Sequence, residues 1–174
     1  MQIQEAAKKS VGMNCSASSF ELQQIIRMAN FIKEEISLLD SKIKNIIDSL
    51  NTPLMSIPGL SYVIVSIILS EIGSIERFST PDKLLAFAGL DPTVYQSGDY
   101  SSSHSFMVKR GSKYLCWAVM ITARLVSTQV KVFKEYLNKK LSENKHYFVA
   151  TVYTAKKLLR VIYYLLKRNE IFKA

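Results

Sequence analysis

Apolar residues recur at alternating steps of three and four between Leu22 and Leu50, and this period constrains the fold more than any other feature of the sequence. The positions are Leu22, Ile25, Ala29, Ile32, Ile36, Leu39, Ile43, Ile46 and Leu50. This spacing places all of them on one side of an α-helix and is typical of a coiled-coil seam. We therefore predict a coiled-coil helix over residues 18–51, capped by Ser18 or Ser19. Its apolar side needs a partner, either a second copy through residues 22–50 or another segment of a longer protein.

The stretch LMSIPGLSYVIVSIILSEIG, Leu54 to Gly73, predicts a helix, a turn at Pro58-Gly59 and a second helix. It resembles a helix-hairpin-helix, whose turn points backbone N–H groups at a DNA phosphate. Pro58 and Gly59 are therefore candidate nucleic-acid contacts. The motif usually has a second glycine where this chain has Ser61, so a packed hairpin that never meets DNA is an equally good interpretation.

Three more helical segments are expected downstream. The first is capped by Ser79 or Thr80, has Pro81 at its first position and stops at Gly89. Residues 111–141 predict a helix with a break near Ser127, and residues 143–169 predict the last helix.

No segment alternates as a β-strand does, so the predicted fold class is all-α. Residues 1–17 are expected to be a poorly ordered lead-in, and residues 52–174 to form the helical C-terminal domain. Within that domain we interpret Tyr114 and Trp117 as core residues. Tyr163 and Tyr164 pack in the core or stack on bases.

Positive charge is concentrated in one part of the chain. Residues 105–174 carry 15 Lys and Arg against 3 Asp and Glu, whereas residues 1–104 carry 8 against 11. A surface so basic is expected to meet phosphate, although a solvated helical face that binds nothing is the alternative. The candidate nucleic-acid-binding cations are Lys109, Arg110, Lys113, Lys156, Lys157 and Arg160.

Several classes of protein are not expected. The longest apolar run, Tyr62 to Leu69, is far shorter than the roughly 20 residues that cross a bilayer, so no membrane partner is predicted. Cys15 and Cys116 are too few for a disulfide framework or a zinc site, which favours a reducing, cytoplasmic location. His104 and His146 lack neighbours at metal-ligand spacing, so we predict no metal and no cofactor bound by this chain.

Between Gly89 and Leu115 the sequence GLDPTVYQSGDYSSSHSFMVKRGSKYL is dominated by polar residues, in contrast to its apolar flanks. Long connections of this kind are uncommon in a compact domain and are usually functional or disordered. This segment is therefore the first place to look for a site.

The ordered segments IPG, EIG, RF, LLAFAGLDP, QSG and KRGSKYL, followed by a basic helical tail, resemble the C-terminal region of the IS110/IS116/IS902 family of transposases. The likeness runs from about Leu22 to Arg168. Each segment alone is weak, but their order is specific. The resemblance implies a DNA recombinase that moves insertion sequences, with DNA and a structured non-coding RNA as its partners.

The resemblance also implies which domain supplies each functional group. An N-terminal RuvC-like domain binds a divalent metal such as Mg²⁺ through acidic residues, a coiled coil follows, and the C-terminal domain contributes a serine that forms a covalent phosphoserine link with DNA. The serine of the family's Ser-Gly pair falls on Ser97. Because an unactivated serine is a poor nucleophile, it needs a base or metal, and Asp99 or His104 are candidates to take its proton. Lys109 and Arg110 are the nearest cations for the attacked phosphate.

Three observations oppose a simple transfer of this function. QSGD is also an ordinary turn sequence, in which Ser97 needs no catalytic role. Cys116 stands where the family commonly has an arginine. The metal-binding half is also not recognisable before the coiled coil, so we expect an excised domain or the product of a truncated gene that is inactive alone. The alternative function is a non-catalytic module for oligomerisation and nucleic-acid binding.

Overall fold

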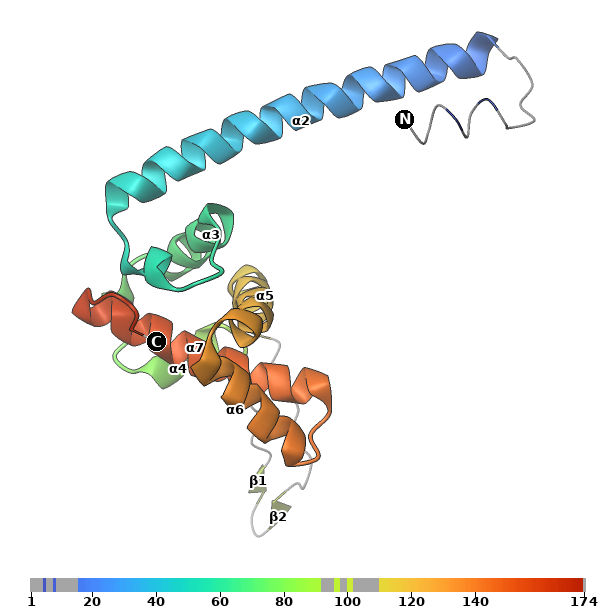
Figure 1. The fold of residues 1–174 in the computed structure, drawn as a ribbon. Helices are drawn as coiled ribbons and strands as arrows, with labels where there is room; N and C mark the ends of the chain where they lie inside the picture. Colours follow the sequence, from blue (N-terminus) through green and yellow to red (C-terminus); the bar gives the residue numbers. More distant parts are fainter. Residues whose placement is uncertain are drawn as a thin grey trace. The chain divides into compact units, whose positions relative to one another are not determined.

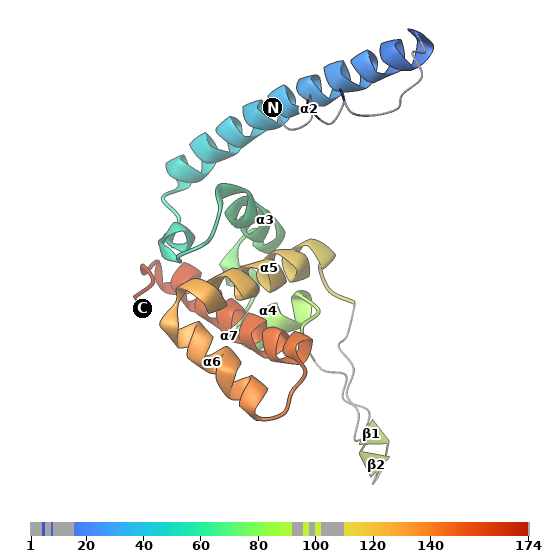
Figure 2. The same cartoon turned by 45° about the vertical axis from the view of Figure 1, so that its right-hand side comes forward.

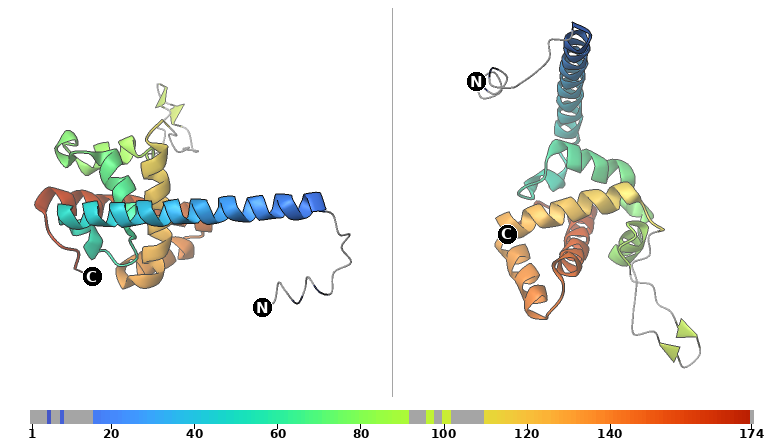
Figure 3. Two further views of the ribbon diagram at one scale, coloured as in Figure 1. Left: turned by 90° about the horizontal axis from the view of Figure 1, so that it is seen from above. Right: turned by 90° about the vertical axis from the view of Figure 1, so that its right-hand side faces the viewer.

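The computed structural model describes residues 16–91 and 110–173, together with residues 5 and 8 and the backbone of 96–97 and 100–101. The chain divides into two units, Met1–Ser41 and Lys42–Ala174, and the boundary falls within helix α2 (Ser16–Leu50). Figures 1 and 3 show α2 as one uninterrupted helix. It starts two residues before the predicted start, so the prediction that Ser18 or Ser19 caps it is wrong.

The apolar seam of α2 is exposed in the first unit. Its large members there, Leu22, Ile25, Ile32, Ile36 and Leu39, are each 53–57% exposed. The last turns of α2 differ, because Ile47 is buried in the core of the second unit and Ile43 packs against that core.

The hairpin after α2 is shorter than predicted. Its first element is a single 3₁₀ turn, η1 (Pro53–Ser56), with the Thr52 hydroxyl accepting a hydrogen bond from Leu54 N. Its second element is α3 (Tyr62–Ile72), which the Ser61 side chain caps by accepting from Ile64 N. As predicted, α3 ends at Gly73, whose φ of 62° suits a residue without a Cβ.

The Arg-Phe pair that follows is structural. η2 (Ile75–Arg77) leads to α4 (Pro81–Phe87), which starts as predicted, with Thr80 as its cap and Pro81 at its first position. Arg77 Nη1 donates to the Ile72 carbonyl at 3.2 Å, and its guanidinium lies over the rings of Phe78 and Phe87. Arg77 thus connects the end of α3 to Phe78, which follows η2, and to Phe87 at the end of α4.

Three longer helices complete the second unit: α5 (Lys113–Gln129), α6 (Lys131–Ser142) and α7 (Tyr147–Arg168). The break predicted near Ser127 falls at Val130, where α5 and α6 meet with a bend of 103°. α7 packs against α4, α5 and α6, and α5 also packs against α3 (Figure 2). Among the described residues no single helix is long and apolar enough to cross a membrane, and α5 with α6 passes such a test only as a bent pair.

Helices make up the fold, as predicted, with one short exception. β1 (Gln96–Ser97) and β2 (Tyr100–Ser101) pair antiparallel, with Gln96 opposite Ser101 and Ser97 opposite Tyr100. The pair is too short for the alternation of apolar and polar residues that identifies strands in sequence.

The core of the second unit is built mainly from Leu, Ile, Val and Ala of η1, α3, α4, α5 and α7. Tyr163 belongs to it and donates its hydroxyl to the Phe78 carbonyl at 3.1 Å. The interpretation of Tyr114 and Trp117 as core residues is wrong, because their side chains are 57% and 52% exposed. Tyr164 is exposed as well.

Candidate nucleic-acid interface

The two ends of the polar segment between α4 and α5 meet at Gly89 and Gly111, where their backbones are in contact. We call this contact the closure. A Cβ added to Gly111 would lie 2.2 Å from the Gly89 nitrogen and 2.3 Å from the Phe87 carbonyl oxygen. Both distances are far below van der Waals contact, so only glycine fits there. The next residue completes the closure, since Ser112 N donates to the Phe87 carbonyl at 2.7 Å. Backbone packing therefore explains why a glycine follows Lys-Arg in this sequence.

Ser112 joins this closure to the start of α5 and to α3. Its Oγ donates to Glu71 Oε2 at 2.7 Å and accepts from Leu115 N at 3.0 Å, which caps α5. One hydroxyl thus connects helices that are separated by the whole polar segment. The two ends of that segment are fixed relative to α3, α4 and α5.

The structure places the predicted catalytic residue only in part. Ser97 has its backbone in β1, paired with Tyr100. The side chain of Ser97 and all of Lys109, Asp99 and His104 lie outside the described residues, so their predicted roles stay predictions. Arg110 is described and is exposed directly before Gly111.

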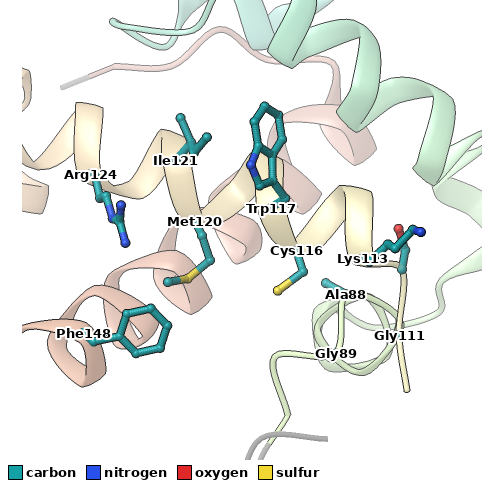
Figure 4. Close-up of a pocket in the computed structure, with 11 residues that line it drawn as sticks. Ala88, Gly89, Gly111, Lys113, Cys116, Trp117, Met120, Ile121, Arg124 and Phe148 are labelled. Atoms are coloured by element: carbon teal, nitrogen blue, oxygen red, sulfur yellow. The ribbon is translucent and has the colours of Figure 1, made fainter. Parts of the chain in front are cut away.

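A cavity of about 490 Å³ opens beside this closure. Its lining comes from the closure itself, from one side of α5 and from the first turn of α7: Ala88, Gly89, Gly111, Ser112, Lys113, Cys116, Trp117, Met120, Ile121, Arg124 and Phe148. Along the side of α5 that lines the cavity, Figure 4 shows Trp117 and Ile121 projecting away from Phe148, whereas Cys116 and Met120 project toward Ala88 and Phe148. The lining contains two cations and no carboxylate.

Cys116, which stands where the resemblance implies an arginine, lines this cavity and is half-buried. Burial raises the pKa of its thiol, because a thiolate is poorly solvated there.

The predicted cations of α7 differ in their surroundings. Arg160 Nη2 bonds Asp82 Oδ1 at 3.0 Å, which joins α7 to the start of α4. Burial lowers the pKa of Lys156, with Arg160 acting in the same direction and Asp91 against it. Lys157 Nζ lies 4.6 Å from the centre of the Tyr136 ring on α6.

Lysines and tyrosines interleave along α6 and α7. The Tyr153 ring has three ammonium groups within 6 Å of its centre, from Lys140 at 5.1 Å, Lys145 at 5.4 Å and Lys156 at 5.9 Å. Glu143 is the carboxylate beside them, bonded to Lys140 at 2.9 Å, and that pairing lowers its own pKa and raises that of Lys140. Clustered cations with aromatic rings are typical of surfaces that follow a nucleic-acid backbone.

The predicted contacts Pro58 and Gly59 lie in the turn before α3, and Gly59 has a φ of 89°. The Gln129 side chain of α5 fills the space beside Gly59, since an added Cβ would lie 2.7 Å from its Oε1. This neighbour supports the interpretation of a packed hairpin as much as that of a phosphate site.

The described residues contain no group of three or more His, Cys, Asp or Glu side chains that could hold a metal ion. The resemblance assigns its divalent metal to another domain, and no step of the function proposed below passes through a metal.

A helical domain with a basic, aromatic-bearing surface beside a closed polar segment is typical of nucleic-acid-binding proteins. The chain belongs to the IS116/IS110/IS902 family of transposases, whose family model matches residues 51–138, from the turn before η1 into α6. Membership places it in the transposase class and implies interaction with DNA. No curated protein matches the chain.

The search for site residues in the sequence missed Trp117 and Phe148. For Trp117 the available signal was its position between Lys113 and Arg124 on one helix, but an apolar residue in a periodic helix is more often core. Phe148 lies on another helix, α7, and nothing local in the sequence relates it to these cations.

Proposed function

We propose that this chain is the part of a DNA transposase that binds nucleic acid and carries the serine nucleophile, Ser97. The observation that carries the proposal is the closure at Gly89 and Gly111, which fixes the base of the segment that bears Ser97 beside exposed cations. Nucleophiles are often presented by connecting segments on a rigid scaffold, because a bulky phosphodiester must reach them.

In the proposed reaction the Ser97 Oγ attacks a DNA phosphorus. A bond forms between Oγ and phosphorus, and the bond from phosphorus to one sugar oxygen breaks. The Oγ proton passes to a base, for which Asp99 and His104 remain candidates, and the leaving sugar oxygen takes up a proton. Cations that contact the phosphate stabilise the charge that develops on its oxygens.

Binding is proposed to come from the basic surfaces of α5, α6 and α7. Each phosphate that a lysine or arginine neutralises releases counterions, so affinity should fall with a slope of about −0.9 per contact in a plot of log K against log salt. Titration of labelled duplex DNA with the chain at several salt concentrations measures this slope. A slope near zero would contradict a phosphate-binding function.

The catalytic part is tested by trapping a covalent protein–DNA complex with the chain joined to the metal-binding domain that the resemblance implies. Ser97→Ala should abolish the complex and leave the salt-dependent affinity unchanged. Ser101→Ala is the matched control, because Ser101 lies on the paired strand and should retain the complex. A complex that survives Ser97→Ala would show that another residue is the nucleophile.

The alternative is a module that oligomerises and binds nucleic acid without catalysis. The exposed seam of α2 favours the oligomerisation part of this function. The same trapping experiment separates the two, since the module predicts binding without any covalent complex.

A further inference from the structure

The cavity on α5 combines features that the proposed function does not require. Lys113, Trp117, Met120 and Arg124 follow each other at steps of 4, 3 and 4, so they share one side of the helix. The two cations are separated by about 16 Å along the helix axis, with the apolar residues between them.

Large apolar surfaces are left exposed here. Trp117 is 52% exposed and Phe148, across the cavity on α7, is 50% exposed. Cys116 and Met120 lie between them in the lining (Figure 4). A concave, mostly apolar site with a few polar groups at its edge is the usual form of a site for a small planar ligand.

The charge of the lining residues indicates which kind of ligand fits the cavity. Lys113 and Arg124 line the cavity, Arg110 is exposed directly before Gly111, and no acidic residue is among the lining residues. An apolar protein segment would gain nothing from these cations. An unpaired nucleobase flanked by its own phosphates matches both the apolar middle and the positive ends.

The position of the cavity indicates which strand supplies that base. Gly89 and Gly111, which close the segment bearing Ser97, are themselves part of its lining. A DNA strand that binds where the two ends of this segment meet would therefore lie beside the cavity.

We propose that this cavity binds an unstacked base of the DNA strand on which the transposase acts, with Trp117 as an aromatic wall and Lys113 and Arg124 contacting the flanking phosphates. This inference rests on the proposed function, because it takes the strand to be DNA. Extrusion of a base costs more free energy in a duplex, where it must be unpaired and unstacked, than in a single strand, so single-stranded DNA should bind the cavity best.

Trp117 is the only tryptophan in the chain, so its fluorescence reports directly on the cavity. The full chain is titrated with single-stranded oligothymidine, with an abasic oligonucleotide of the same length, with a duplex and with oligouridine. Oligothymidine should quench the fluorescence saturably, and the abasic strand should bind with little quenching. Equal quenching by the abasic strand, or stronger binding and quenching by oligouridine, would overturn the proposal of a DNA base.

Variants provide a second measurement by anisotropy of labelled oligothymidine. Trp117→Ala should weaken binding about tenfold, since one stacked base contributes about 1–3 kcal/mol, and Trp117→Phe should retain most of the affinity. Phe31→Ala removes an exposed aromatic ring from α2, outside the cavity and outside the basic surfaces of α5, α6 and α7, and is the matched control. An unchanged affinity of Trp117→Ala would overturn the proposal.

The two proposals fail differently. Salt-dependent DNA binding without quenching of Trp117 would overturn the base site and leave the proposed function standing. Absence of any salt-dependent binding to DNA would overturn both.

Discussion

Gly111 and Gly89 lie backbone against backbone, with room for no Cβ on Gly111: an added one would be 2.2 Å from the Gly89 nitrogen. We therefore expect Gly111→Ala to destabilise the second unit by about 3 kcal/mol, because forced overpacking typically costs 1–3 kcal/mol and backbone yields less than side chains. Urea denaturation followed by circular dichroism measures the change. Lys83→Ala, an exposed substitution on α4, should stay within about 0.5 kcal/mol of the parent chain. Equal stability of Gly111→Ala would contradict the closure.

The hydrogen bond between Ser112 and Glu71 should be measurable by a double-mutant cycle. Ser112→Ala removes both the cap of α5 and the bond to the carboxylate, so we expect a loss of about 1–2 kcal/mol. Glu71→Ala should cost less, because the cap remains. The coupling energy of the pair should be about 0.5–1.5 kcal/mol by urea denaturation. Additive effects would mean that the contact contributes nothing to stability.

Much of the fold follows from local rules that sequence expresses directly. Thr80 with Pro81 marks the start of α4, because the Thr80 side chain accepts a hydrogen bond from the Lys83 backbone N–H. Gly73 marks the end of α3, because glycine readily adopts the positive φ found there. The bend between α5 and α6 was predicted three residues early, since nothing local distinguishes Ser127 from Val130. The first part of the hairpin was predicted as a helix and is a single 3₁₀ turn.

Less of the candidate site could be predicted from the sequence, because its features depend on contacts that form only when the chain folds. The need for glycine at 111 arises from the Phe87 carbonyl and the Gly89 nitrogen, which approach it only after folding. The exposure of Trp117 similarly depends on how the neighbouring helices pack against α5 after folding. Helical period identifies the apolar side of a helix but not how far a neighbouring helix covers it.

The pair between Arg160 and Asp82 predicts a change in nucleic-acid binding. Asp82→Asn removes the carboxylate bonded to Arg160 and leaves that guanidinium available to a phosphate. Under the proposed function, DNA affinity should rise at low salt and the slope of log K against log salt should steepen by up to about 0.9. Asp40→Asn on α2 makes the same change of charge elsewhere and is the control. An identical effect of both substitutions would mean that net charge alone acts, and Arg160 would then have no special role.

The raised pKa of the Cys116 thiol predicts that the free energy of unfolding depends on pH. Because burial raises the pKa of its thiol, the folded chain binds a proton that the unfolded chain releases once the pH exceeds the ordinary thiol pKa of about 8.5. This group's contribution to stability is therefore constant below that pH and is lost as the pH rises through the folded pKa. Alkylation of Cys116 in a Cys15→Ser chain should be slower than for the same chain in urea. Equal rates at pH 8 would contradict the buried thiol.

The exposed seam of α2 predicts association through the first unit. Ile32 and Ile36 are each 53% exposed and lie on the seam that the heptad spacing defines, so burying them is the expected driving force for pairing of two copies. A charge at such a position must lose its hydration when the seams meet, so Ile36→Glu should shift the chain toward monomer in light scattering at micromolar concentration. Lys33→Glu changes charge outside the seam and should leave the oligomer intact. A chain that is monomeric before any substitution would mean that α2 pairs with another protein or another segment. In that case Ile36→Glu should leave DNA binding by the second unit unaffected, because the basic surfaces of α5, α6 and α7 contain no residue of α2.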